Sequence, residues 1–236
     1  MLARGVAASK HTAPSHMIIK YLFNQKVQVI WLILLFSLTL SQSSYYSRSD
    51  YSLFIDEEFL ETGDIIFRTG GSVLSHAVLL NDPTSEFSHV GIVYKSNTRS
   101  FVIHIAPSEG AAVLTSTSFA QIEPLESFLS LDKASLAAVF RLHSADKNIA
   151  KHATDIARSY VDEQRTFDFD LDLATEEQLY CTELVWRAYN EAGIDLVDKQ
   201  FDNLSILFSE QNKYYILPSR LAKSKHVYQV LMVSSP

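Results

Sequence analysis

The chain contains a single cysteine, Cys181, in the segment Leu179-Tyr-Cys-Thr-Glu-Leu-Val185. The sequence predicts that a helix begins at or near this residue. The positive end of a helix dipole stabilises a thiolate, so a thiol in the first turn is expected to have a lowered pKa and to act as a nucleophile. Thr175 and Gln178 could instead form a capping box that begins the helix earlier, and Cys181 would then gain little from the dipole. A small buried hydrophobe is the structural alternative for a lone cysteine.

Two histidines could activate such a thiol. His89 opens the predicted strand Ser88-His-Val-Gly-Ile-Val93, and His104 lies in the next one, Phe101-Val-Ile-His-Ile-Ala-Pro107. The short polar connection between them favours an antiparallel hairpin, in which the two rings can be neighbours. A thiol nucleophile needs an imidazole base, and that base needs a polar group to orient it. We therefore predict Cys181 as nucleophile, His89 as base and His104 as orienting residue, against the alternative of core histidines bonded to backbone.

The residues around the thiol suggest further roles. The Tyr180 hydroxyl could assist an oxyanion hole together with the Cys181 backbone N–H, although packing explains a tyrosine equally well. Glu183 could contact a base or the substrate, or serve the helix structurally. Cys181, His89 and His104 could also bind zinc, but their sequence spacing matches no zinc motif, so neither a metal nor another cofactor is expected.

Hydrophobic periodicity predicts the elements that position these residues. Strands are expected at Asp64–Phe67, His89–Tyr94, Phe101–Ala106, Val113–Ser116, Leu136–Leu142, Tyr214–Leu217 and Val227–Val233. Helices are expected at Val73–Leu80, Ile149–Tyr160 and Leu184–Ala192, the last capped by Gly193. The segment Phe167–Leu173 alternates acidic and apolar residues and predicts an edge strand or exposed flap. Strands, then helices, then strands indicate an α+β fold with a mostly antiparallel sheet packed against helices.

Composition and charge exclude several classes of protein. The chain has 236 residues, of which 47% are hydrophobic, and one cysteine, which excludes wholesale disorder and an intrachain disulfide framework. Without the first 41 residues the chain has 16 basic against 27 acidic residues, a net charge of −11. A body this acidic is a poor partner for nucleic acid, and we expect none.

The amino-terminal segment predicts export. Residues Val27–Leu40 are nearly all apolar, Lys20 and Lys26 precede them, and a serine-rich stretch follows. This is the pattern of a signal peptide, or of a membrane anchor over residues 18–40. We divide the chain into a signal peptide or anchor (1–41), a linker (42–57) and one hydrolase domain (58–236), with Met1 or Met17 as the start. The expected location is the periplasm or cell envelope.

Three motifs, in this order, resemble the YiiX/YaeF-like permuted papain-fold amidases of the NlpC-type cell-wall peptidase superfamily: Gly63-Asp-Ile-Ile-Phe67, Ser88-His-Val-Gly-Ile92 and Tyr180-Cys-Thr-Glu-Leu184. The segment Val102–Pro107 is similar to the strand of the lecithin:retinol acyltransferase-like branch that carries the third catalytic residue. The resemblance spans Glu61 to Val233. It implies a permuted papain-like fold with Cys181, His89 and His104 as the triad. The family commonly has Glu where His104 stands, so a negative charge is missing here.

The function expected from these observations is that of an exported cysteine hydrolase. It would cleave an amide bond through a thioester acyl-enzyme, on a cell-wall peptide or an acyl-lipid. One alternative is a lipid acyltransferase or deacylase that uses the same triad. The other is a non-catalytic module that binds a peptide or lipid, for which the thiol pKa would be normal or raised.

Overall fold

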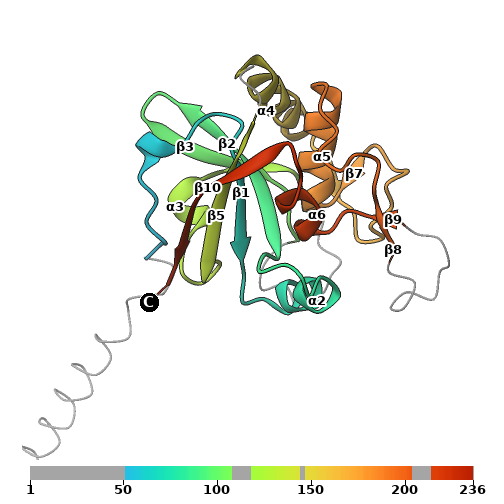
Figure 1. Ribbon diagram of the computed structural model, residues 1–236, viewed down its shortest axis with the longest axis horizontal. Coiled ribbons are helices and arrows are strands. Elements are labelled where there is room, and N and C mark those ends of the chain that lie inside the picture. Colours follow the sequence, from blue (N-terminus) through green and yellow to red (C-terminus); the bar gives the residue numbers. More distant parts are fainter. Residues whose placement is uncertain (1–50, 108–117, 144–146, 204–213, 236) are drawn as a thin grey trace, which may run out of the picture. The chain divides into compact units, whose positions relative to one another are not determined.

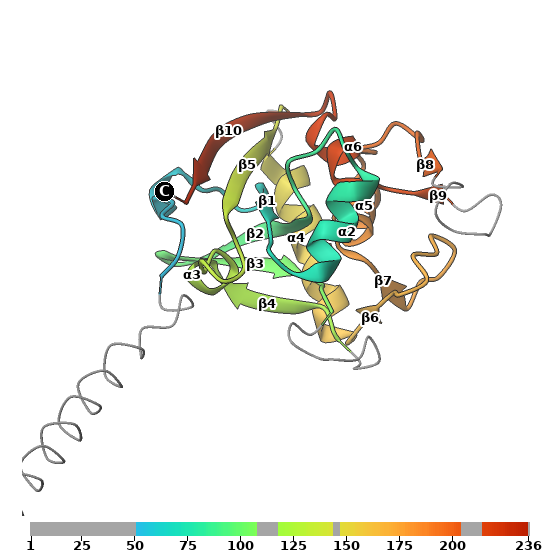
Figure 2. The same cartoon turned by 90° about the horizontal axis from the view of Figure 1, so that it is seen from below.

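The computed structural model describes residues 51–107, 118–143, 147–203 and 214–235. Its centre is a six-stranded antiparallel sheet in the order β10-β5-β1-β2-β3-β4 (Figure 1). The strands are β1 (Ile65–Thr69), β2 (His89–Ser96), β3 (Arg99–His104), β4 (Gln121–Pro124), β5 (Leu136–Leu142) and β10 (Val227–Ser234). Figure 2 shows the sheet curving from β10 at one edge to β4 at the other. The predicted antiparallel α+β fold is confirmed.

The helices are α2 (Val73–Asn81), α3 (Leu125–Phe128), α4 (Lys147–Asp162), α5 (Cys181–Glu191) and α6 (Pro218–Ala222), with a 3-10 turn η2 (Glu57–Phe59). Two small sheets pair β6 (Thr166–Phe167) with β7 (Gln178–Leu179) and β8 (Asp202–Asn203) with β9 (Tyr214–Tyr215). The three predicted helices are confirmed as α2, α4 and α5. Gly193 adopts φ 103° just beyond α5, a conformation that glycine accepts without strain.

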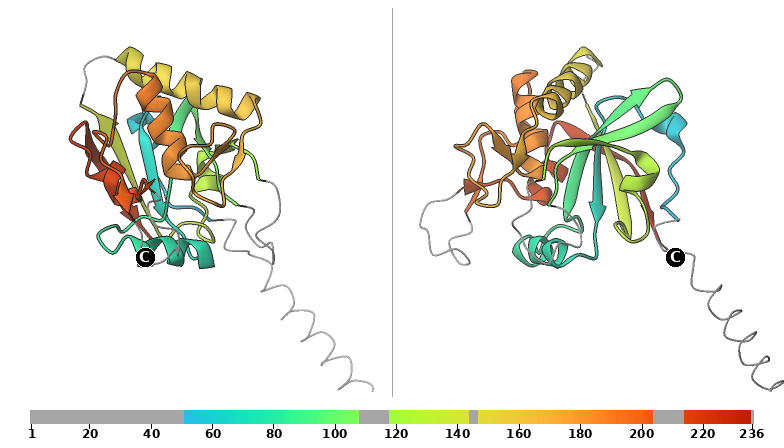
Figure 3. Two further views of the ribbon diagram at one scale, coloured as in Figure 1. Left: turned by 90° about the vertical axis from the view of Figure 1, so that its right-hand side faces the viewer. Right: turned by 180° about the vertical axis from the view of Figure 1, so that it is seen from behind.

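The sheet has a hydrophobic core on each face, because successive strand residues point to opposite sides. In β1, Ile65 and Phe67 belong to the core beneath α4 and α5, whereas Ile66 belongs to a second core with α3. Figure 3 shows α4 and α5 side by side on one face and α3 on the other. Leu53 and Ile55 are 5% and 6% exposed in the second core, so this part of the predicted linker packs onto the domain.

Of the two alternatives predicted for the segment Phe167–Leu173, the structure shows a partly exposed loop and not an edge strand. Only Thr166–Phe167 forms strand β6, and the rest is a loop. The Asp168 carboxylate, which is buried, accepts hydrogen bonds from the N–H groups of Asp170 at 2.8 Å and Asp172 at 2.5 Å. A short acidic side chain thus takes donors that a strand ladder would need.

The predicted signal peptide or anchor and the predicted strand Val113–Ser116 lie outside the described residues. Within the ranges that are described, no helix has both the length and the hydrophobicity to span a membrane.

Candidate active site

Cys181 is the first residue of α5. Tyr180 precedes it in an extended conformation (φ −106°, ψ 170°) as the N-cap, and the Glu183 carboxylate accepts the Tyr180 N–H at 3.3 Å. The helix therefore begins at the cysteine, and the alternative start at Thr175 is wrong. The Thr175 hydroxyl lies instead within hydrogen-bond distance of the carbonyls of Asp172 and Gln178.

Tyr180 and Thr182, the two neighbours of Cys181 in the sequence, both form hydrogen bonds with the backbone of Ile216. The Tyr180 hydroxyl accepts a hydrogen bond from the Ile216 N–H at 3.0 Å, and the Thr182 hydroxyl donates to the Ile216 carbonyl at 2.6 Å. Tyr180, Thr182 and Ile216 are all buried, so these two hydrogen bonds fix the start of α5 to the segment just before α6. We call this pair of hydrogen bonds the Ile216 latch. The Tyr180 hydroxyl thus has a structural partner, and its contact with an oxyanion stays a prediction.

Glu183 is fully buried, and its environment is structural. Besides the Tyr180 N–H, it accepts the Arg187 Nε–H at 2.8 Å. Burial raises the pKa of Glu183 to about 7, against the opposing effect of Arg187. A contact between Glu183 and substrate stays a prediction.

The structure brings the two predicted histidines together. His89 begins β2 and His104 ends β3, and β2 and β3 form the expected antiparallel hairpin. The His89 Nε2 and His104 Nδ1 atoms lie 3.0 Å apart, and the ring planes are 81° to each other. Both rings are buried and contact the Phe128 ring, with centroids 5.6 and 5.1 Å away.

Gly91 permits this close approach. A Cβ atom at this position would lie 2.5 Å from Val102 Cγ1 and 3.0 Å from His104 Cβ. Any side chain here would push β3, and with it the His104 ring, away from β2.

Beyond His104 lie two charged residues that the sequence analysis missed, Glu123 and Lys133. The Glu123 Oε2 atom lies 3.0 Å from His104 Nε2, and Glu123 Oε1 accepts the Lys133 ammonium at 2.6 Å. Burial would raise the pKa of Glu123, but the hydrogen bonds from His104 and Lys133 outweigh it and lower this pKa to about 2. The negative charge that His104 lacks is therefore supplied by Glu123, which contacts the side of the His104 ring that faces away from His89. The pairing of β3 with β4 places it there, and no motif marks it in the sequence.

Arg68 adds a buried cation to the same cluster. It pairs with His89 in the register of β1 and β2 and is 4% exposed. Its guanidinium carbon lies 4.8 Å from the centre of the Phe128 ring, and its Nη1 donates to the Lys133 carbonyl at 2.8 Å. A charged residue within the otherwise apolar segment 65–68 is the signal that could have revealed it.

The environment keeps the reacting groups neutral. Burial lowers the pKa of His89 well below 6.5, and the charges of Arg68 and Lys133 act in the same direction. Burial also lowers the pKa of His104, against the opposing effect of Glu123. Burial raises the pKa of the Cys181 thiol to about 11 and outweighs the backbone hydrogen bonds that favour the thiolate. The expectation of a lowered thiol pKa is therefore wrong, because desolvation exceeds the effect of the helix start.

The position of the sulfur follows from those backbone hydrogen bonds. They come from Thr182, from Cys181 itself and from Val90, the residue that follows His89. The thiol thus lies against the backbone at the start of β2. Within the residues that the structure describes, no hydrogen bond joins the sulfur to the His89 ring. His89 and His104 are in contact, and the sulfur lies against the backbone of Val90, the neighbour of His89. The catalytic roles of the three residues stay predictions.

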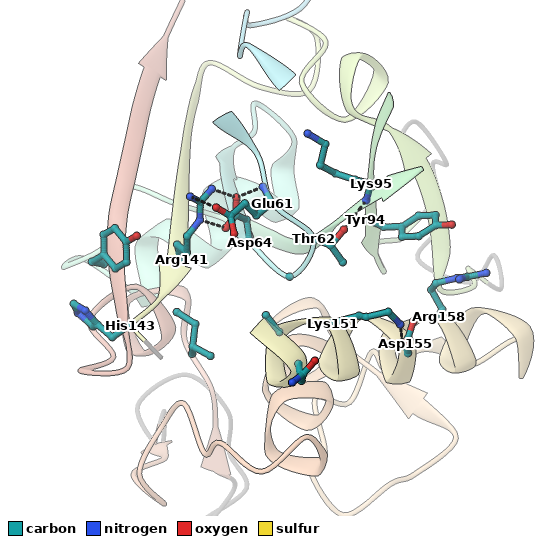
Figure 4. A pocket seen from close by; sticks show the side chains of 15 residues that line it. Glu61, Thr62, Asp64, Tyr94, Lys95, Arg141, His143, Lys151, Asp155 and Arg158 are labelled. Atoms are coloured by element: carbon teal, nitrogen blue, oxygen red, sulfur yellow. Dashed lines mark hydrogen bonds and ion pairs between the residues drawn. The ribbon is translucent and has the colours of Figure 1, made fainter. Parts of the chain in front are cut away.

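The opposite end of β2 borders a cavity of about 660 Å³. Figure 4 shows its lining, with Arg141 bound to Asp64 and Glu61 on one side and Lys151 beside Asp155 on α4. Neither Cys181 nor the two histidines line it. Among the described residues, no three His, Cys, Asp or Glu side chains are grouped so that they could hold a metal ion.

Comparison with known proteins identifies relatives. The model of the permuted papain-like amidase enzymes, YaeF/YiiX, C92 family, matches residues 59–231. A crystal structure of the metalloprotein YiiX from Escherichia coli O157:H7 is similar to the chain, with a TM-score of 0.59 and 19% identity over 75% of this chain and 98% of that one. At this identity the likeness concerns the fold alone. The chain matches no curated protein.

Proposed function

The chain belongs to the YaeF/YiiX family of permuted papain-like amidases, a family of cysteine hydrolases, and from this premise we propose that it cleaves an amide bond of a peptide with Cys181 as nucleophile. His89 is the base, and His104 orients it. The observation that carries this assignment is the 3.0 Å contact between the two rings at the start of β2, where the N-terminus of α5 also places the thiol.

The reaction proceeds through a thioester. The Cys181 thiol gives its proton to His89 while the sulfur attacks the amide carbon, and the C–S bond forms as the carbonyl oxygen takes up negative charge. The C–N bond then breaks, and His89 returns the proton to the departing amine. Water, deprotonated by His89, attacks the thioester. The C–S bond then breaks, the carboxylic acid leaves, and His89 returns its proton to the sulfur, which restores the thiol.

The neutral resting site decides how the thiol is activated. Because the thiol has a pKa of about 11 and His89 a pKa well below 6.5, thiol and imidazole both carry no charge at neutral pH. Proton transfer therefore accompanies the attack on substrate and does not precede it. This raised thiol pKa is also what a non-catalytic binding module would have, and the experiment below distinguishes the two.

The proposed substrate is a peptide of the cell wall, and the proposed location is the cell envelope. The family implies a peptide amide, and the segment over residues 18–40 supports export. Lipid substrates and membrane anchoring have no support in the described residues.

A metal is not part of the proposed mechanism. The word metalloprotein describes the E. coli YiiX structure. In this chain three of the four ring nitrogens of the two histidines face other partners, because His89 Nε2 contacts His104 Nδ1 and His104 Nε2 contacts Glu123. Nδ1 of His89 alone is not a site for a metal ion, which needs several ligands. The described side chains do not fit a metal site.

The test compares the products of the full chain and its variants acting on cell-wall peptides, analysed by chromatography and mass spectrometry. We expect cleavage by the wild type, loss of about 10⁴-fold or more in Cys181→Ala, and a loss of about 10²–10⁴-fold in His89→Ala. His152→Ala, which removes an exposed histidine of α4, is the matched control and should retain full activity. Acid quenching should trap the acyl group on Cys181.

Cleavage that survives in Cys181→Ala would refute the proposal. Absence of cleavage, with alkylation of Cys181 by iodoacetamide unchanged in His89→Ala, would establish the binding module instead. A parallel reaction with added acyl acceptors would reveal acyl transfer.

A further inference from the structure

His89, His104 and Glu123 form a line of contacts. Of the three, only Glu123 has a hydrogen-bonding role that is fixed in advance, because an ionised carboxylate can only accept hydrogen bonds, whereas each neutral imidazole has one donor and one acceptor nitrogen. The Lys133 ammonium, 2.6 Å from Glu123 Oε1, keeps this carboxylate ionised and holds it in place.

We propose that Glu123 is a positioning residue that sets the tautomers of both histidines and thereby makes Nδ1 of His89 the basic nitrogen of the site. This inference deepens the proposed function, on which its catalytic consequence rests. The tautomers themselves are a property of the resting protein and can be measured without any substrate.

The protonated nitrogen of each ring follows from the contacts, starting at Glu123. Glu123 Oε2 lies 3.0 Å from His104 Nε2, so this nitrogen must carry a proton and donate it. In a neutral ring His104 Nδ1 is then an acceptor. His89 Nε2 lies 3.0 Å from that acceptor, so His89 Nε2 must be the donor. Nδ1 of His89 is left without a proton and with its lone pair free to receive one.

The neutrality of both rings is essential to this reasoning. Burial and the nearby cations Arg68 and Lys133 lower the pKa of each histidine, so neither ring holds a second proton near neutral pH. The residues facing the pair from the neighbouring elements are Arg68 on β1, Glu123 on β4, and Lys133 between α3 and β5. Only Glu123 among them is an acceptor.

One further contact bears on the assignment. The Gln121 amide nitrogen lies 3.3 Å from His104 Nε2, where it would act as a competing donor. An amide can present its oxygen in the same place, and a protonated Nε2 requires that orientation. The shorter contact to a charged acceptor decides between the two, since charge-assisted hydrogen bonds are about twice as strong as neutral ones.

The experiment is nitrogen NMR of the full chain labelled with 15N-histidine, which distinguishes protonated from unprotonated ring nitrogens. The signals are assigned with His89→Gln and His104→Gln variants. We expect the Nε2–H tautomer for both His89 and His104 in the wild type. Glu123→Gln offers both a donor and an acceptor to His104, so we expect a mixture of tautomers or the Nδ1–H form. Glu123→Asp keeps the ionised acceptor and should retain the Nε2–H forms.

Activity provides the second measurement. Glu123→Gln should lower kcat about 10–100-fold, in the range found for groups that orient a functional histidine, while KM changes little. Glu123→Asp should recover part of this loss. Glu126→Gln is the matched control, because Glu126 forms an exposed ion pair with Arg99 at 2.8 Å and touches neither histidine.

The outcomes separate the two proposals. An Nδ1–H tautomer of either ring in the wild type overturns the inference. Nε2–H forms that persist in a folded Glu123→Gln variant overturn it as well. If the tautomers are as expected but no amide is cleaved, the inference stands and the proposed function fails.

Discussion

The two ends of β2 carry polar clusters built on opposite principles. Near its end, Arg141 donates to Asp64 at 2.7 Å, to Glu61 at 2.9 Å and to the Phe59 carbonyl at 2.6 Å, so donors and acceptors match and opposite charges neutralise one another. At its start, the carboxylate of Glu123 contacts His104 and His104 contacts His89, while the thiol of Cys181 lies against the backbone next to His89. Buried charge alone does not indicate chemistry. The proposed function depends instead on the line of contacts from Glu123 through His104 to His89.

The largest effect on stability is expected at the cluster of Arg141, Asp64 and Glu61. Arg141→Ala leaves the Asp64 carboxylate buried without its cation, and removing one partner of a buried ion pair typically costs about 3–5 kcal/mol. Chemical denaturation should show this loss, while kcat of the folded protein stays unchanged. The deficit should shrink as the pH is lowered, because burial already raises the Asp64 pKa and a protonated Asp64 needs no cation. A fall in kcat at unchanged stability would contradict the comparison.

A smaller loss of stability is expected at the Ile216 latch, the hydrogen bonds between Ile216 and the side chains of Tyr180 and Thr182. Thr182→Val leaves the Ile216 carbonyl without its 2.6 Å donor and should cost about 1–3 kcal/mol of the free energy of unfolding. Because the latch positions Cys181, kcat should fall as well. Thr154→Val removes an equally buried hydroxyl, which donates to the Ala150 carbonyl within α4 at 2.9 Å. That control should lose stability and leave kcat unaltered; equal kcat values for the two variants would exclude a positioning role for Thr182.

The smallest effect is a shift in pH dependence. Burial, Arg68, His104 and Lys133 all lower the pKa of His89, so the base stays unprotonated below pH 6.5, and kcat/KM should begin to fall only at more acidic pH. In Arg68→Met one of these cations is absent, the pKa of His89 rises, and the fall should begin at a higher pH. The pH–rate profiles of the two proteins provide the measurement. A shift of the acid limb in the opposite direction would disprove this electrostatic role of Arg68.

Local patterns predicted much of the fold and two parts of the site. The alternation around His89 and His104, with a short polar connection, predicts the hairpin that joins the rings, and this was confirmed. Periodicity likewise located α4 and α5. The start of α5 remained open between Thr175 and Tyr180, because it depends on the side chains of Glu183 and Thr182 finding partners in the folded protein.

The remaining features depend on tertiary contacts that leave no local signal. Glu123 is one acid among many in the sequence, and only the pairing of β4 with β3 brings it to His104. The thiol pKa depends on how deeply the sulfur is desolvated, which the position of Cys181 at a helix start does not reveal. The sequence left an edge strand and an exposed flap open after Phe167, and the loop forms because the Asp168 carboxylate binds two backbone N–H groups.

The raised pKa of the Cys181 thiol has a consequence for its oxidation. Peroxides and disulfides react with the thiolate, and burial raises the pKa of Cys181, so the thiolate is a minor form at neutral pH. The nucleophile is thereby protected from sulfenic acid formation and from mixed disulfides between turnovers. In the proposed mechanism, the thiol loses its proton to His89 only while it attacks a bound substrate.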